Sequence, residues 1–127
     1  MEILIVDSSI QIIERLEEIL SESDNINAIH KAVCYEEASK LFKENEPDFV
    51  LLDVSLPGKE SFKILKEIKE ISRKTFVIIL SSDLDKYIKE ECTSLGSDFF
   101  FDKYYDFEKI CGVINTIGQR EENASHY

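Results

Sequence analysis

The chain has 127 residues, with 26 Asp and Glu against 15 Lys and Arg, so its formal net charge is −11 at pH 7. This length fits one domain, and a hydrophobic content of 43% is enough for a buried core. The negative charge argues against direct binding to nucleic acid or to an anionic membrane surface, because both are bound mainly through Lys and Arg.

The first residues carry no signal for export or membrane insertion. The apolar run at residues 3–6 is short, and no basic stretch precedes it. Cys34, Cys92 and Cys111 have neither the number nor the spacing of a disulfide framework or a metal site. We therefore expect three reduced thiols, most of them in the core, in a cytoplasmic protein.

Short apolar runs alternate with segments in which apolar residues recur every three or four positions. The runs predict buried strands, and the periodic segments predict amphipathic helices. Ser8 or Ser9 can cap the first helix, and Gly96 can end the fourth in the left-handed conformation. In chain order, the expected elements are strand 3–6, helix 12–20, strand 26–33, helix 35–44, strand 49–52, helix 62–71, strand 76–80, helix 83–94, strand 99–101 and helix 107–117.

This alternation predicts the fold class. Strands separated by helices pair in parallel through right-handed crossovers, and the helices then cover both faces of the sheet. The chain is therefore expected to be α/β, with a doubly wound five-stranded parallel sheet in the (βα)5 flavodoxin-like arrangement. We expect one domain over residues 1–118 and a polar, fraying tail over residues 119–127.

Polar residues follow four of the five strands: Asp7, Asp53, Ser81 and Lys103. In such sheets the functional crevice lies outside the carboxyl ends of the strands, where the strand order reverses, so these residues are expected to converge. The chain has no glycine-rich phosphate loop and no His at a strand end, which argues against nucleotide binding and against a hydrolase triad. Two close carboxylates would favour Mg²⁺, and an aspartate can accept a phosphoryl group whose oxygens a hydroxyl and an ammonium can hold.

Residues 2–118 resemble the receiver domain of two-component response regulators, and the chain is similar to the stand-alone form. The resemblance implies a phosphorelay signalling protein and not a classical enzyme, since a receiver catalyses only its own phosphorylation and dephosphorylation. The matching segments are ILIVD at residues 3–7, DFVLLD at 48–53 with LPG at 56–58, VIILSS at 77–82 and GSDFFFDK at 96–103.

The resemblance also implies roles for single residues. Asp53 is similar to the phosphoacceptor, and Asp7 to one of the acids that hold Mg²⁺. Ser55 would offer its backbone carbonyl to the metal. Ser81 and Lys103 resemble the switch hydroxyl and the lysine that contact the phosphoryl group.

Other positions of the pattern concern switching, tuning and two departures. Phe100 stands where the family has its switch aromatic, and the positions of Ser55 and Asp83 tune phosphate loss in relatives. Ser8 replaces a second acid, so phosphorylation is expected to need more Mg²⁺. Tyr104 replaces a proline that is often cis, and because a non-proline cis bond costs about 3–4 kcal/mol, we expect a trans bond or a shifted loop.

Three interpretations remain open. The first is a receiver that takes a phosphoryl group onto Asp53 from a sensor histidine kinase or a phosphotransfer protein. Its fourth helix, fifth strand and fifth helix would then present a changed surface to a downstream protein. The second is a pseudo-receiver, a protein-interaction module that is not phosphorylated, which Ser8 favours. The third is an unrelated flavodoxin-like enzyme or cofactor binder, against which the missing phosphate loop argues.

Overall fold

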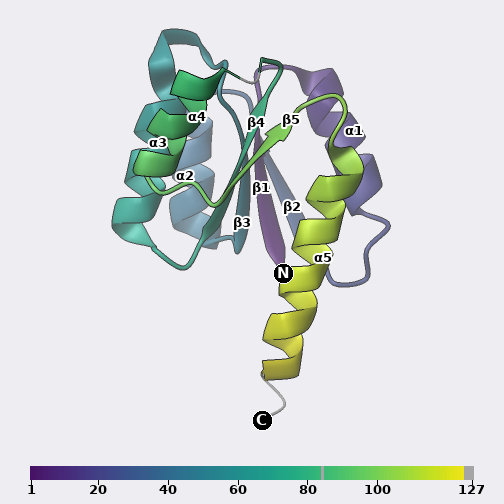
Figure 1. Ribbon diagram of the computed structural model, residues 1–127. Helices are drawn as coiled ribbons and strands as arrows, with labels where there is room; N and C mark the ends of the chain where they lie inside the picture. Colours follow the sequence, from purple (N-terminus) through teal and green to yellow (C-terminus); the bar gives the residue numbers. More distant parts are fainter. Residues whose placement is uncertain (84, 125–127) are drawn as a thin grey trace.

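A parallel sheet of five strands forms the centre of the molecule (Figure 1), as the alternation of elements predicts. The computed structural model describes residues 1–83 and 85–124. The sheet order is β2-β1-β3-β4-β5, and every neighbouring pair is parallel. The strands are β1 (Glu2–Val6), β2 (Ala28–Ala32), β3 (Phe49–Asp53), β4 (Phe76–Ser81) and β5 (Phe99–Asp102).

Helices cover both faces of this sheet, which gives the expected doubly wound α/β fold (Figure 1). One face packs against α1 and α5, and the other against α2, α3 and α4. In residues 1–83 and 85–124, every helix is too short or too polar to cross a lipid bilayer. The helices are α1 (Ile10–Leu20), α2 (Tyr35–Asn45), α3 (Glu60–Ile71), α4 (Lys86–Ser94) and α5 (Phe107–Ala124), with a short 3-10 turn (Pro57–Lys59) before α3.

The central strands are buried on both faces, which explains their unbroken apolar runs. The four apolar residues of β1 and the four of β3 have no exposed surface. β5 lies at the sheet edge, and its three phenylalanines are only partly buried. Phe99 and Phe101 pack toward α1 and α5, whereas Phe100 packs toward the opposite core. The edge position leaves part of this aromatic strand at the surface.

Capping side chains fix where two helices begin. Ser9 caps α1, and its hydroxyl accepts the N–H of Ile12 at 3.4 Å. The expected start of α4 at residue 83 is wrong, because Asp85 accepts the N–H groups of Tyr87 and Ile88 and so begins the helix at Lys86. The expected left-handed end of α4 is confirmed, since Gly96 has φ +102°.

The last helix is longer than the apolar pattern indicates. α5 continues to Ala124, whereas the sequence favours an end near Gly118 and fraying beyond it. Its last turns project past the sheet (Figure 1). Residues 125–127 of the expected tail lie outside the described residues.

The three cysteines are free thiols, as expected, but only Cys92 belongs to the core. Cys34 and Cys111 are half-buried, so the expectation that most of the thiols are core residues is wrong. Cys92 lies on α4 and is 1% exposed. Burial raises the pKa of the Cys92 thiol to about 11.

A carboxylate on α3 ties that helix to α2. Glu67 accepts hydrogen bonds from the Tyr35 hydroxyl at 2.5 Å and from the Ser39 hydroxyl at 2.6 Å. Its Oε1 atom also lies 3.1 Å from Lys43 Nζ. Burial alone would raise the pKa of Glu67, but the hydrogen bonds from Ser39, Tyr35 and Lys43 outweigh burial, and the pKa is lowered. The Glu67 network is therefore an ionised link between two helices.

Candidate functional site

Two acidic side chains meet at the carboxyl edge of the sheet. The chain moves from β1 outward to β2 and then returns to β3 on the other side of β1, so the strand order reverses between β1 and β3. Asp7 follows β1, and Asp53 ends β3; Val6 pairs with Leu52, which places the two aspartates at the same level. Asp7 is 0% exposed and Asp53 is 1% exposed.

Lys103 bridges these two carboxylates. Its Nζ atom lies 2.9 Å from Asp7 Oδ2 and 3.2 Å from Asp53 Oδ2. The backbone N–H of Lys103 donates to the Ser81 carbonyl at 2.9 Å, which anchors the lysine next to the end of β4. Since Lys103 is 7% exposed, this is a buried group of two acids and one base. Its formal charge is −1 when all three side chains are ionised.

Strand alternation explains why these three side chains meet. Successive residues of a strand point to opposite faces of the sheet. Asp7 follows Ile3 and Ile5 at intervals of two, and Asp53 follows Phe49 and Leu51, all of which face α1 and α5. Lys103 follows Phe99 and Phe101 on that same face. The alternation therefore brings both acids and the lysine to one side of the sheet edge.

Burial and pairing act in opposite directions on these ionisable groups. For Lys103, burial alone would lower the pKa, but the hydrogen bond to Asp7 and the charge of Asp53 outweigh it, and the pKa is raised. Burial raises the pKa of Asp7, even though the N–H of Ser9 and the ammonium of Lys103 act to lower it. Lys103 is thus a cation throughout the neutral pH range.

In each of the two carboxylates, one oxygen accepts a backbone N–H group and the other does not. Asp7 Oδ1 accepts the N–H of Ser9 at 2.8 Å, and Asp53 Oδ1 accepts the N–H of Ser55 at 3.0 Å. The Oδ2 atoms of both aspartates are buried without a hydrogen bond of ordinary geometry, although each is within ion-pair distance of Lys103 Nζ. Two such hard oxygen donors at one edge fit Mg²⁺, which binds one or two carboxylates and keeps several waters. Within the part of the chain that the structure describes, no third acidic, His or Cys side chain joins them.

The structure does not bring the predicted switch hydroxyl into this group. Ser81 is the last residue of β4 and is 1% exposed. Ile78 and Leu80 face α1 and α5, so the next residue, Ser81, points to the opposite face of the sheet. Its hydroxyl donates to the backbone carbonyl of Asp83 and accepts the Asp83 N–H at 3.1 Å. The Ser81 hydroxyl is therefore turned toward the loop before α4.

The remaining predicted site residues surround the group. Ser8, Ser55 and Asp83 are exposed. Phe100 is partly buried and packs against the core that α2, α3 and α4 cover. None of these four side chains has a described contact with the two acids or the lysine, so the structure gathers Asp7, Asp53 and Lys103 and leaves the others at the rim.

Two residues that were not identified from the sequence have side chains that hydrogen-bond to the backbone at or next to Asp53 and Lys103. The buried Ser61 on α3 donates its hydroxyl to the Asp53 carbonyl at 2.5 Å. At the end of β5, Asp102 accepts the N–H groups of Tyr104 and Tyr105 in the loop that follows. An aspartate two residues before a free N–H is a common turn signal, and it was present in the sequence. The bond between Lys103 and Tyr104 is trans, since the described residues contain no cis peptide.

Comparison with known proteins gives a consistent family. The family model for the response regulator receiver domain matches residues 3–115. The chain is 29% identical over 115 residues to Protein CcdB of Bacillus subtilis (strain 168), covering 91% of this chain and 95% of that protein. It is 27% identical over 115 residues to the Fimbriae Z protein of Salmonella typhimurium, covering 91% of this chain and 55% of that protein. The chain thus spans about half the length of this second relative.

Solved structures agree on the fold. A CheY-like response regulator receiver domain protein from Methanospirillum hungatei JF-1 superposes with a TM-score of 0.85 over 97% of each chain, at 18% sequence identity. Identity at this level shows a shared architecture, and the chemistry of the site has to be argued from its own residues.

Proposed function

The chain belongs to the response regulator receiver domain family of two-component systems, and from that premise we propose that it accepts a phosphoryl group on Asp53. The observation that carries the proposal is the buried bridge in which Lys103 Nζ lies 2.9 Å from Asp7 Oδ2 and 3.2 Å from Asp53 Oδ2. Burying a cation between two acids costs desolvation free energy, which lowers the stability of the fold. Such a group is therefore expected where its charges serve binding. The same charges suit a site that receives an anionic group.

Asp53 is the better acceptor of the two acids. It lies on β3, between β1 and β4, so Asp7 and the end of β4 flank it on either side. Ser61 holds its backbone carbonyl and the Ser55 N–H holds Oδ1, which leaves Oδ2, whose ion-pair partner is Lys103, as the nucleophilic oxygen. Phosphoryl transfer depends mainly on such positioning and on charge neutralisation.

The transfer balances as a simple displacement. With a phosphohistidine donor, an Asp53 carboxylate oxygen forms a bond to phosphorus while the phosphorus–nitrogen bond breaks, and its electron pair remains on the donor imidazole. Lys103 pairs with the phosphoryl oxygens in place of Asp53 Oδ2. Asp7, Asp53 and the Ser55 carbonyl would hold Mg²⁺, which when bound neutralises charge on the phosphoryl oxygens. Water later attacks phosphorus, the bond between phosphorus and the Asp53 oxygen breaks, and inorganic phosphate leaves while the carboxylate is restored.

Ser81 and Phe100 would couple this event to the surface. The Ser81 hydroxyl exchanges its bonds to the Asp83 backbone for a bond to a phosphoryl oxygen, and the loop before α4 moves with it. Phe100, which is only partly buried, changes its packing as that loop moves. Exposed Ser8, Ser55 and Asp83 at the rim would set metal affinity and the rate of phosphate loss.

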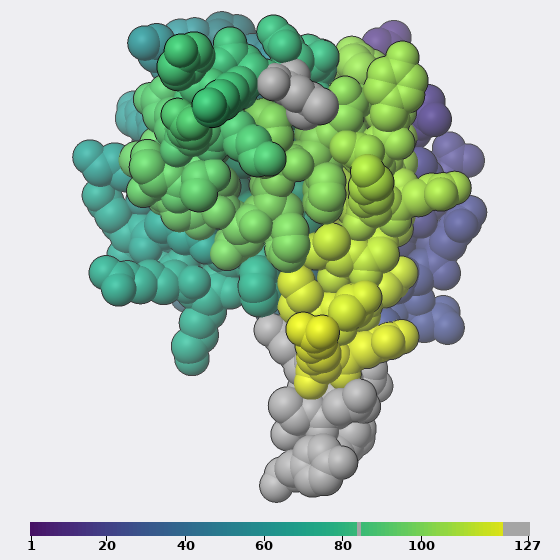
Figure 2. All heavy atoms as spheres, in the orientation of Figure 1, coloured from purple at the N-terminus to yellow at the C-terminus, as the bar shows by residue number. Residues whose placement is uncertain are grey.

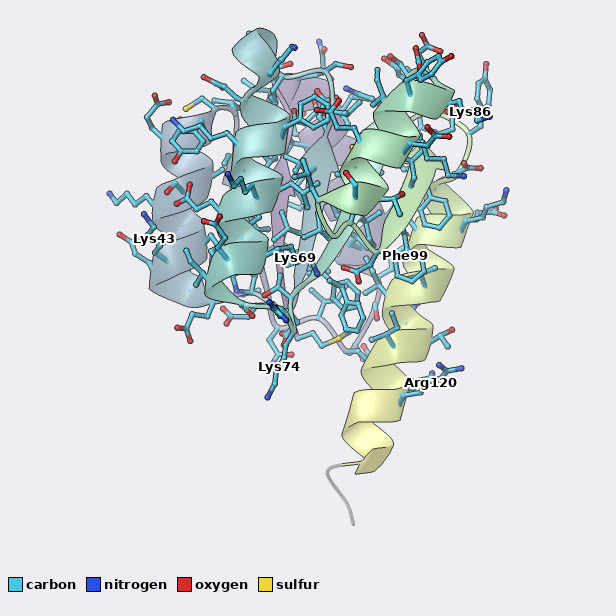
Figure 3. The ribbon with its side chains drawn as sticks, turned by 60° about the vertical axis from the view of Figure 1, so that its left-hand side comes forward. Lys43, Lys69, Lys74, Lys86, Phe99 and Arg120 are labelled. Carbon is cyan, nitrogen blue, oxygen red and sulfur yellow. The ribbon has the colours of Figure 1, made fainter. Side chains whose placement is uncertain are left out.

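The output surface would be the face formed by α4, β5 and α5, which binds a downstream protein. Phe99 and Phe101 line a groove of about 550 Å³ between β5 and α5, with Val113 and Ile117 on the helix side. Figure 2 shows this face, and Figure 3 shows Phe99 beside α5 with Arg120 farther along the helix. Aromatic side chains at a partly exposed strand are typical of protein contacts. A sensor histidine kinase or a phosphotransfer protein would supply the phosphoryl group.

The decisive experiment is intact mass after incubation with acetyl phosphate, with and without Mg²⁺. The wild type should gain one phosphoryl group in the presence of Mg²⁺, and Asp53→Asn should gain none. Asp48→Asn is the matched control, because Asp48 is an aspartate at the opposite edge of the sheet, where it accepts the N–H of Glu2. Equal labelling of wild type and Asp53→Asn would refute Asp53 as the acceptor.

One observation favours the alternative of an unphosphorylated pseudo-receiver. Ser8 is exposed and uncharged beside Asp7, so the site has two carboxylates, and Lys103 already pairs with both. A Mg²⁺ titration of labelling separates the two functions. We expect labelling with a half-saturating Mg²⁺ concentration that Ser8→Asp lowers, because a third carboxylate adds a strong oxygen ligand. No labelling of the wild type at any Mg²⁺ concentration, together with no spectral shift on addition of beryllofluoride and Mg²⁺, supports the pseudo-receiver.

A further inference from the structure

The loop that carries Lys103 is closed by two aspartates. Asp102 Oδ1 accepts the backbone N–H of Tyr104 at 2.8 Å and that of Tyr105 at 2.9 Å. Asp106 Oδ2 accepts the backbone N–H of Asp102 at 2.7 Å, and the N–H of Asp106 donates to the Asp102 carbonyl at 3.3 Å. We call residues 102–106 the Asp102 turn. The hydrogen bonds of this turn join residues on both sides of Lys103 in the chain.

Burial does not hold this turn. Tyr104 is 52% exposed and Tyr105 is 88% exposed, so neither aromatic ring fixes the backbone by packing into the core. The pairing of Asp106 with Lys109, at 3.3 Å, involves a lysine side chain that is 70% exposed and contributes little. The Asp102 carboxylate is thus the group that holds the two backbone N–H groups directly after Lys103, while Asp106 closes the far end of the turn.

Lys103 needs such a constraint because it must reach two fixed points. Its four-carbon stem has many rotamers, yet its Nζ atom lies within 3.2 Å of both Asp7 Oδ2 and Asp53 Oδ2. The backbone before Lys103 is fixed by β5, and its own N–H is bonded to Ser81. The backbone that follows Lys103 lies outside the sheet.

We infer that Asp102 is a positioning residue for Lys103: by accepting the N–H groups of Tyr104 and Tyr105, it holds the turn from which Lys103 reaches both acids. Its effect on the bridge does not depend on phosphorylation, whereas its effect on labelling rests on the proposed function. The required atom is an acceptor oxygen and not a negative charge. Asp102→Asn should therefore keep the turn, and Asp102→Ala should open it.

The first test measures how well Lys103 is protected, without any phosphoryl donor. Each folded variant is treated briefly with an amine-acetylating reagent, and mass spectrometry of its peptides gives the acetylation rate of Lys103 relative to Lys109. Asp102→Ala should raise that ratio about tenfold, because two hydrogen bonds to a charged acceptor are lost, and Asp102→Asn should stay within about twofold of wild type. Asp48→Ala, which loses one carboxylate–amide bond at the far edge, should leave the ratio unchanged.

The second test measures the acetyl phosphate labelling rate in the same variants. Asp102→Ala should label about tenfold more slowly and Asp102→Asn near the wild-type rate, since small displacements of a catalytic group cost large factors in rate. A protected Lys103 in Asp102→Ala, or an exposed one in Asp102→Asn or Asp48→Ala, overturns the inference. If the acetylation of Lys103 follows the expected pattern but acetyl phosphate labels neither the wild type nor any variant, the positioning role stands and the proposed function fails.

Discussion

Replacement of Lys103 by methionine tests the buried bridge most directly. Methionine keeps an unbranched side chain of similar length but removes the ammonium, so packing changes little while the charge disappears. Asp7 and Asp53, exposed by 0% and 1%, are then left without their shared cation. Lys103→Met should therefore destabilise the fold at pH 7, because two like charges remain buried next to each other.

The expected magnitude follows from the two contact distances. At 2.9 and 3.2 Å, each ion pair has a Coulomb attraction of roughly 5–6 kcal/mol for an effective dielectric constant of 20. Desolvation of the three groups offsets most of this, and removal of one partner from a buried pair typically costs about 3–5 kcal/mol. Since the Lys103 side chain is only 8% exposed, solvent screening reduces this cost little.

Urea unfolding measures the loss. The chain has no Trp, so far-ultraviolet circular dichroism is the appropriate signal. With a denaturant slope of about 2 kcal/mol per molar, a loss of about 4 kcal/mol lowers the midpoint by about 2 M. The double variant Asp7→Asn/Lys103→Met removes the repulsion between the two carboxylates and should recover part of the stability, because Asp53 alone remains buried without its cation. A midpoint within about 0.5 M of wild type for Lys103→Met would refute the reasoning that the bridge carries the charge balance of the site.

Three further outcomes follow from other parts of the molecule. Glu67→Gln should lower the free energy of unfolding by about 1–2 kcal/mol at pH 7. Because the pKa of Glu67 is lowered from 4.5 in the folded protein, this difference in stability is fully present above pH 4.5 and disappears as the pH falls through the lowered pKa. An undiminished difference between the urea unfolding curves at about pH 3 would contradict this. Gly96→Ala should cost about 1–3 kcal/mol, since φ is +102° and a Cβ would lie 3.2 Å from Lys69 Cγ; a thermal midpoint equal to wild type would argue against this strain. Cys92, with a pKa of about 11, should react with a thiol reagent at pH 8 only on unfolding, and modification as fast as that of the half-buried thiols would show local opening.

Much of the fold was predictable because it depends on local periodicity. The apolar runs of β1, β3 and β4 have no polar interruptions, and only a strand buried on both faces requires that. The helix boundaries were less accurate, because a cap is a contact between particular atoms. With Asp85 as its cap, α4 begins at Lys86 and not at residue 83, and α5 continues to Ala124 in a segment with little apolar pattern. Periodicity identifies an element, and side-chain hydrogen bonds end it.

The candidate site was predictable in position but not in detail. Parallel strands place their carboxyl ends at one edge, so Asp7, Asp53 and Lys103 had to lie near one another once the topology was known. Strand alternation, which is readable in the sequence, separates them from Ser81. Because Ser81 points the other way, its hydroxyl bonds to the Asp83 backbone and not to the acids.

The sequence by itself determined the composition of the site: two acids, one base, and a serine at position 8 where a third acid was expected. Only the tertiary structure decided that Lys103 neutralises both acids at once and that Asp102 holds the turn behind it. The physical reason is distance along the chain. Residue types and their spacing are local properties, whereas a bridge between positions 7, 53 and 103 exists only when the strand order, the register and one loop place three side chains within about 3 Å.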